Sequence, residues 1–193
     1  MDFRELVKTN LTYRRFDQNH SIPKETLVRL VELTRYCASG GNRQSLRFIC
    51  SCTTEWNQKI FDALAWAAYL PKWLGPSEGE RPAGYIVILG DPSEWKWMMA
   101  DLGIVAQTIL LEAVNMGLGG CMFGNINKKL LQKEFNISEP LEAILVIALG
   151  KPVEKVVIED VPESGSIKYY RTEDGVHHVP KRSLQDILLE AYE

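Results

Sequence analysis

Residues 93–120 read SEWKWMMADLGIVAQTILLEAVNMGLGG, and this stretch decides the fold. We predict a helix over 93–116 that is apolar on nearly every face, which is typical of a helix at the centre of a core. It also carries Asp101 and Glu112, and a charge near the middle of a bilayer costs roughly 2.5–3.5 kcal/mol on insertion scales. We therefore interpret it as a core helix and not as a membrane span, ended by Gly117.

The glycines that follow this helix, Gly117, Gly119 and Gly120, look superficially like a dinucleotide-binding fingerprint. That fingerprint needs a strand before the glycines and a helix that opens at their end. Here the helix comes first, so a Rossmann interpretation fails. Two alternatives remain: a helix end followed by a turn, or a backbone left bare so that a ligand can approach it closely.

Short helices and strands are predicted on both sides of this stretch. The predicted helices cover 2–10, a segment that starts at Pro23 and ends before Ala38, 55–69, 127–135 and 183–192, and the predicted strands cover 46–52, 85–89 and 141–149. Because helices and strands mix without a regular alternation, the pattern favours an α+β fold over a doubly wound α/β fold. A length of 193 residues, with no linker or repeat, predicts a single domain over 1–193.

Composition and charge exclude several classes of function. The formal net charge of −3 offers no basic surplus for nucleic acid. The four cysteines match no zinc pattern, so we expect no metal site and a reduced, cytoplasmic protein. The first residues do not show a basic start followed by an apolar run, so we expect no signal peptide. We also expect no membrane partner. The sequence contains no motif of a hydrolase, a zinc protease or a phosphate-binding loop.

Three groups of polar residues are candidate binding residues, each with an ordinary structural alternative. Arg14 and Arg15 are adjacent, so in an extended segment one would point inward toward an anion, unless both are simply solvated. The loop residues Ser39, Asn42 and Gln44 form a turn or offer donors and acceptors to a heteroaromatic ring. Lys181 and Arg182 precede Ser183, the expected N-cap of the last helix. They form either an exposed basic pair or a phosphate-binding site.

Taken in order, these segments resemble the FMN-dependent nitroreductases, a family that includes NADH oxidase-like and flavin reductase-like proteins. The matching segments are 12–16 (TYRRF, similar to RRSxRxF), 38–44 (ASGGNRQ, similar to PSxxNxQPW), 101–107 (DLGIVAQ), 117–124 (GLGGCMFG), 148–152 (ALGKP) and 181–182 (KR). The chain departs from the family at Asn10 and Leu11, where the signature has its first basic residues. One phosphate-binding arginine is therefore absent.

The resemblance implies a nitroreductase-like fold, with a central mixed sheet flanked by helices and a long buried central helix. It also implies an FMN site for which no catalytic side chain is required. Thr12 and Arg14 would contact FMN, with Arg14 near the pyrimidine edge of the ring. Gly119 and Gly120 would lie near N5, and Lys181 and Arg182 would pair with the phosphate. Ser39, Asn42 and Gln44 would reach the flavin from the opposite subunit of a homodimer.

The implied activity passes hydride from NADH or NADPH through the flavin N5 to a nitroaromatic, a quinone or a similar small-molecule acceptor, in a ping-pong reaction. A non-catalytic flavin carrier or redox sensor of the same fold is the alternative. Cys37 and Cys121 would lie near the flavin, and we interpret both as small packing residues.

Overall fold

The long strand β5 (Glu142–Pro152) is the centre of the main sheet. The computed structural model describes residues 1–193. β5 pairs with β3 (Gly84–Gly90) on one side and with β4 (Gly119–Phe123) on the other, and its end pairs with β1 (Phe16–Asp17). β2 (Arg47–Ser51) pairs with β3 at the outer edge. All these pairs are antiparallel, and an isolated parallel bridge joins Thr12 to Gly120.

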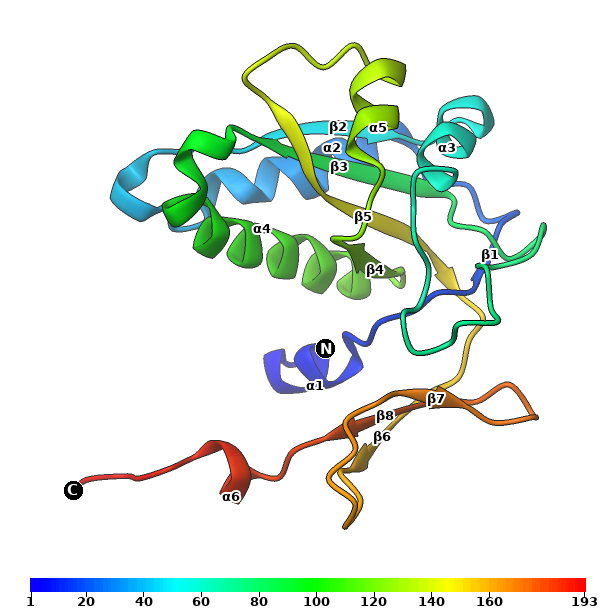
Figure 1. The fold of residues 1–193 in the computed structure, drawn as a ribbon, viewed down its shortest axis with the longest axis vertical. Helices are drawn as coiled ribbons and strands as arrows, with labels where there is room; N and C mark the ends of the chain where they lie inside the picture. Colours follow the sequence, from blue (N-terminus) through cyan, green and yellow to red (C-terminus); the bar gives the residue numbers. More distant parts are fainter.

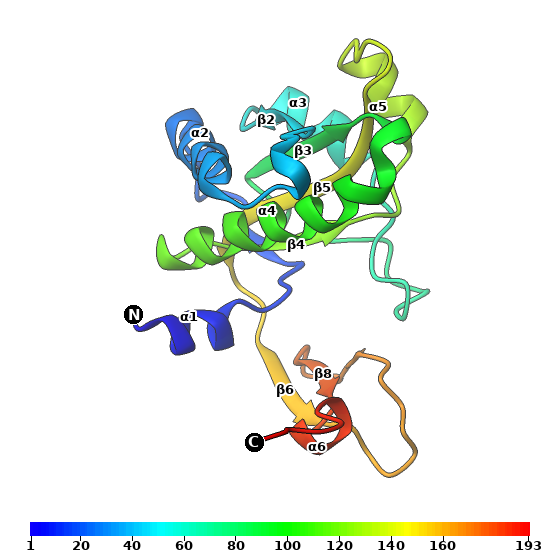
Figure 2. The same cartoon turned by 90° about the vertical axis from the view of Figure 1, so that its left-hand side faces the viewer.

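Helices cover both faces of this sheet (Figures 1 and 2). α2 (Lys24–Leu33) and α4 (Trp95–Asn115) lie on one face, and α3 (Thr54–Phe61) and α5 (Lys128–Glu134) lie on the other. α1 (Phe3–Thr9) contacts α4, and α6 (Leu184–Ile187) follows β8, away from the main sheet. Side chains of β3 alternate between the faces, because successive strand residues point in opposite directions. Ile86 and Ile88 pack in the cluster that holds α2 and α4, whereas Tyr85 and Val87 pack in the cluster that holds α3 and α5. This arrangement explains why every residue of β3 is buried, and it confirms the α+β fold.

α4 has one core face and one exposed face in the single chain. Ala106 and Ile109 are fully buried against the sheet, while Trp97 is 51% exposed and Met99 is 44% exposed. By length and composition, residues 92–115 form the one helix able to cross a membrane, and half of its apolar window is buried inside the protein. Gly117 ends the helix with a φ of +77°.

A small three-stranded sheet lies below the main body in Figure 1. It contains β6 (Val156–Asp160), β8 (His177–Lys181) and β7 (Tyr170–Arg171), in that order. β6 and β8 are parallel, and β7 and β8 are antiparallel. Both parallel and antiparallel pairs therefore occur in the chain.

Three local expectations were wrong. The helix predicted over 55–69 ends at Phe61, because the chain after it bonds to the segment before α5 and leaves the helical path: Leu64 bridges Ile126, and the amide of Asn127 donates to the carbonyl of Ala63 at 2.8 Å. The glycine-rich stretch after the turn at Gly117 was not expected to form a strand, yet Gly119–Phe123 form β4, which bonds along its length to β5.

The third wrong expectation is the last helix, which covers only Leu184–Ile187 and not 183–192. Its predicted apolar face has nothing to pack against in the single chain, because Leu189 and Tyr192 are each 93% exposed. Helices this short gain most of their stability from packing an apolar face. The chain from Leu188 onward is therefore not helical.

Candidate functional site

Arg14 points into the protein, and its neighbour Arg15 points away from that site. The segment is extended, so successive side chains alternate in direction. Arg14 is buried, with 9% of its surface exposed. Arg15 forms a two-pronged ion pair with Glu80 at 2.7 and 2.5 Å, and this pairing lowers the pKa of Glu80. The inward direction expected for one of the two arginines belongs to Arg14.

The guanidinium of Arg14 lies among groups that do not neutralise its charge. Its Nη1 is 3.1 Å from Nε2 of His177, and its central carbon lies 4.7 Å from the ring centre of Tyr169. No carboxylate forms an ion pair with it. Buried charges are usually paired, so an inward cation without an anionic partner is the donor expected of an anion-binding site.

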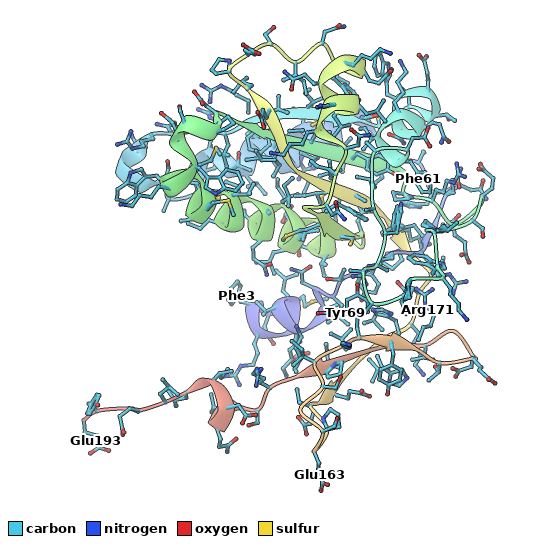
Figure 3. The ribbon with its side chains drawn as sticks, viewed as in Figure 1. Phe3, Phe61, Tyr69, Glu163, Arg171 and Glu193 are labelled. Atoms are coloured by element: carbon cyan, nitrogen blue, oxygen red, sulfur yellow. The ribbon has the colours of Figure 1, made fainter.

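Glu154 holds the backbone of the same segment. This carboxylate is buried, and it accepts a hydrogen bond from the amide of Arg14 at 2.8 Å and one from Nη2 of Arg171 at 2.5 Å. Arg171 belongs to the small sheet and also lies over the ring of Trp73. Figure 3 places Arg171 and Tyr69 at the junction between the main body and the small sheet. Glu154 therefore ties Arg14 to that junction.

Thr12, Gly119 and Gly120 lie beside Arg14. The amide of Tyr13 donates to the carbonyl of Gly120 at 3.0 Å, next to the Thr12–Gly120 bridge. A Cβ at Gly120 would lie 2.6 Å from Leu110 and 2.7 Å from the carbonyl oxygen of Ala148, and one at Gly119 would lie 2.6 Å from Tyr13. Close packing within the chain therefore requires both glycines, whatever else they border.

Ser39, Asn42 and Gln44 form a second group that is anchored by α4. Ser39 Oγ donates to Oδ2 of Asp101 at 2.6 Å and accepts from the amide of Gln44 at 2.9 Å. The amide of Gly40 donates to Oδ1 of Asp101 at 2.9 Å, and the side chain of Gln44 bonds to that of Asn42 at 3.1 Å. The loop lines a cavity of about 200 Å³, and its polar groups are already preorganised.

The single chain does not bring these two groups together. Asp101 anchors the loop, and Leu110 contacts Gly120. Nine residues separate them on one helix, a distance of about 14 Å along its axis.

Lys181 and Arg182 lie at the end of β8 and after it. Both are exposed and neither forms an ion pair. Lys181 is four residues from His177 on one strand, so both point to the same face, roughly 13 Å apart. The amides of Ser183 and Asp186 at the start of the last helix are engaged, because these two residues form a reciprocal capping box.

Sequence reasoning missed His177, Tyr169 and Glu154 as residues of this site. His177 is fully buried, and this burial lowers its pKa to about 4, opposed by Glu154. Its Nδ1 atom is buried without a hydrogen-bond partner. The only signal for His177 in the sequence is that it is adjacent to His178. This pair does not show which of the two rings faces inward.

Cys121 is buried beside this site, whereas Cys37 lies at the loop cavity. Burial raises the pKa of Cys121 to about 11, although the nearby Arg14 opposes the shift. The Cys37 Sγ atom is 3.3 Å from Oγ1 of Thr108. All four cysteines are free thiols.

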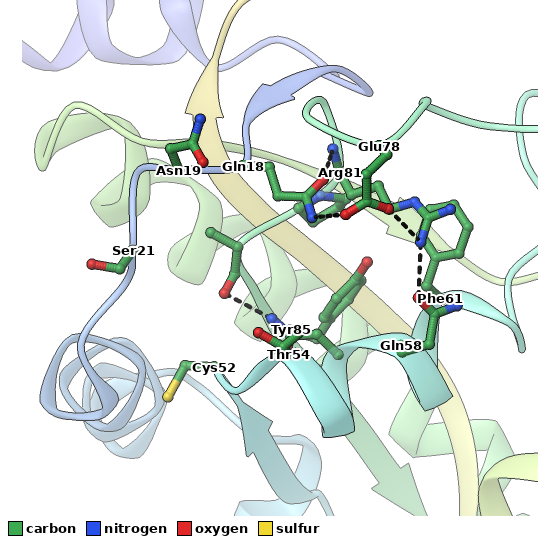
Figure 4. A pocket seen from close by; sticks show the side chains of 13 residues that line it. Gln18, Asn19, Ser21, Cys52, Thr54, Gln58, Phe61, Glu78, Arg81 and Tyr85 are labelled. Carbon is green, nitrogen blue, oxygen red and sulfur yellow. Dashed lines mark hydrogen bonds and ion pairs between the residues drawn. The ribbon is translucent and has the colours of Figure 1, made fainter.

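A separate cavity of about 310 Å³ lies beside α3 (Figure 4). Arg81 donates to Gln58 at 2.8 Å, forms an ion pair with Glu78 and lies over the ring of Phe61. Tyr85 lines the cavity, and burial raises its pKa. None of the expected site residues lines it.

The chain is similar to known proteins over most of its length. The family model "Nitroreductase family" matches residues 8–151. The Bacillus subtilis protein YodC, which carries the name of an NAD(P)H nitroreductase, is 26% identical over 180 residues, covering 78% of this chain and 89% of that protein.

Solved structures show the same fold. A nitroreductase family protein from Clostridium difficile 630 superposes with a TM-score of 0.64 at 24% identity, covering 80% of this chain and 86% of that one. An Exiguobacterium sibiricum protein named as a nitroreductase and solved in complex with FMN gives a TM-score of 0.65 at 18% identity, covering 80% and 90%.

The chain therefore has the fold of a nitroreductase-type α+β protein. It belongs to the nitroreductase family. Both the family resemblance and the fold class expected from the sequence are confirmed.

Proposed function

We propose that this protein is an FMN-dependent oxidoreductase that takes electrons from NADH or NADPH and reduces small acceptors such as nitroaromatics or quinones. The observation that carries the proposal is the buried guanidinium of Arg14, which faces no carboxylate and lies beside the glycine strand β4. Bound FMN would supply the hydride chemistry, accepting a hydride from the nicotinamide at N5 and passing it to the acceptor.

The residues present fit this cofactor. Arg14 would hold the pyrimidine edge, and its positive charge would favour the negative charge that develops there on reduction. Thr12, Gly119 and Gly120 would border the ring. Lys181 and Arg182, exposed and without ion pairs, would hold the phosphate through charge-assisted hydrogen bonds. Arg14 contacts His177, and His177 lies on the same face of β8 as Lys181. This placement suits a ligand that has a ring at one end and an anion at the other.

The proposal includes a homodimer, in which Ser39, Asn42 and Gln44 of one chain complete the site of the other. Their separation from Arg14 within one chain supports this arrangement, as does the exposed apolar surface of α4 and the C-terminal segment. Trp97 is 51% exposed and Leu189 is 93% exposed, and apolar surface of this kind is typical of an interface. Light scattering should give the mass of a dimer; a monomer that binds FMN would contradict the shared site.

Reconstitution with FMN tests the cofactor. The purified protein should take up FMN and show the visible absorption bands of a bound flavin. A colourless protein that does not bind added FMN would refute the proposal. A flavin-loaded protein that neither NADH nor NADPH reduces would instead be a carrier or sensor.

A further inference from the structure

The guanidinium of Arg14 is held by two residues from the C-terminal part of the chain. His177 begins strand β8, and Tyr169 immediately precedes β7. Nε2 of His177 lies 3.1 Å from Nη1 of Arg14, and the Tyr169 ring stacks on its guanidinium at 4.7 Å. The two rings also contact each other, with centres 5.2 Å apart. Arg14 is thus fixed on one edge by a nitrogen and on one face by an aromatic ring.

The contact with His177 has one workable protonation state. A guanidinium only donates hydrogen bonds, so Nε2 must accept and the ring must be neutral, with its proton on Nδ1. The groups around the ring agree with a neutral imidazole: burial, Arg14, Arg171 and His178 disfavour its protonation, and only Glu154 favours it. A neutral acceptor orients Arg14 without cancelling its charge, which a carboxylate in the same place would do.

This arrangement leaves most of the donors of Arg14 free. A guanidinium has five N–H groups in a rigid planar fork. The structure shows one of them engaged by His177 and the thiol of Cys121 beside the guanidinium, while Tyr169 occupies a face and no edge. The remaining edge can meet a planar ligand that accepts two hydrogen bonds side by side.

We infer that His177 and Tyr169 are positioning residues that aim the guanidinium of Arg14 at the pyrimidine edge of the flavin, and that the small C-terminal sheet is thereby part of the cofactor site. The inference rests on the proposed FMN site. It extends that site to residues that do not touch the flavin themselves and act through Arg14.

The other contacts of the small sheet with the body support this role. Arg171 bonds Glu154, which also accepts from the amide of Arg14. The hydroxyl oxygen of Tyr169 accepts from the amide of Tyr69 at 3.3 Å, and the two tyrosine rings pack 4.9 Å apart. The attachment of the sheet and the orientation of Arg14 therefore depend on the same contacts.

The test uses two pairs of variants of the full chain, with FMN as the probe. His177→Leu removes the acceptor, whereas His177→Gln places an amide oxygen where it can accept from Arg14. Tyr169→Leu removes the aromatic face, whereas Tyr169→Phe keeps it. Each variant is measured for FMN affinity by fluorescence quenching and for the reduction potential of the bound flavin, after thermal unfolding has shown that it is folded.

We expect His177→Leu and Tyr169→Leu to bind FMN at least about fivefold more weakly, with a lower potential, and His177→Gln and Tyr169→Phe to recover most of both. Wild-type affinity and potential in both Leu variants, with clear losses in Arg14→Ala, would overturn the inference alone. Wild-type values in Arg14→Ala as well would overturn the flavin site on which it rests. If His177→Leu does not fold, the Tyr169 pair decides, because that ring is only partly buried.

Discussion

Nη1 of Arg14 lies 3.1 Å from Nε2 of His177, although 163 residues separate the two in the chain. This hydrogen bond joins the extended segment before β1 to the first residue of β8. It also places a buried, neutral imidazole beside a buried cation. The N-terminal signature of the family and the C-terminal sheet thus meet at one side chain.

Replacing Arg14 should weaken FMN binding much more than replacing Arg15. Arg14→Ala removes the inward cation, and a hydrogen bond to a charged group contributes about 1.5–3 kcal/mol, so we expect at least a tenfold loss of FMN affinity. Arg15→Ala is the matched control, because this neighbour points away and pairs with Glu80. Equal affinities of the two variants, measured by fluorescence quenching, would show that the direction of Arg14 has no bearing on the flavin.

The direction of Arg14 could be predicted from the sequence, but its partners could not. The side chains of two adjacent arginines in an extended segment must alternate in direction, and the family motif indicates which of the two would face a flavin. The contact with His177 depends on the path of the chain between β5 and β8, which no local pattern encodes. The prediction of a helix over 55–69 was wrong for the same reason, since the bridge between Leu64 and Ile126 is a long-range contact.

The elements that were predicted well are those determined by their own residues. β3 is a continuous apolar run and forms a strand that is buried throughout. α4 is long and apolar, and Gly117 ends it. The loop residues Ser39, Asn42 and Gln44 were expected to act together, and they do share hydrogen bonds. Their anchor Asp101 was noticed as a charge in an apolar helix and as the start of a segment that matches the family, but not as a partner of the loop.

Stability should fall as the pH drops below about 6.5 because His177 must be protonated on unfolding. Its pKa is lowered from 6.5 to about 4 in the folded protein. The unfolded chain therefore binds more protons between these values, so the full free energy of unfolding is present above about pH 6.5 and is lost progressively toward pH 4.

Urea unfolding across this pH range checks the histidine prediction. The variant His177→Gln should lose less stability on acidification than the wild type, because glutamine does not titrate. His20→Gln reports the effect of losing an exposed histidine. The same dependence on pH in wild type and His177→Gln would contradict the assignment of a neutral, buried ring.

Lys181 and Arg182 should contribute to FMN binding only through contacts with its phosphate. Replacing both with Ala should weaken FMN binding by roughly tenfold or more, since two charge-assisted contacts are lost. Riboflavin, which lacks the phosphate, should bind the variant and the wild type alike. Lys24→Ala is the control for removing an exposed lysine elsewhere. An equal loss for FMN and riboflavin would place the pair somewhere other than at the phosphate.

Gly120→Ala should destabilise the fold whether or not a flavin binds. The added Cβ would lie 2.6 Å from Leu110 and 2.7 Å from the carbonyl oxygen of Ala148, and overpacking of this kind costs about 1–3 kcal/mol. Gly103→Ala is the contrasting control, because nothing lies within 4 Å of that position on α4. Alanine there should stabilise the helix by up to about 1 kcal/mol. Denaturant unfolding of the apoprotein measures both, and an undiminished stability of Gly120→Ala would show that β4 does not pack as described.

Anaerobic titration of the FMN-loaded protein with NADH and with NADPH, followed by visible absorption, tests the central claim most directly. At least one of the two nucleotides should bleach the flavin bands completely, and a quinone or nitroaromatic added afterwards should restore them. Flavin bands that persist in an excess of both nucleotides would contradict the proposal that this protein is an NAD(P)H-dependent oxidoreductase.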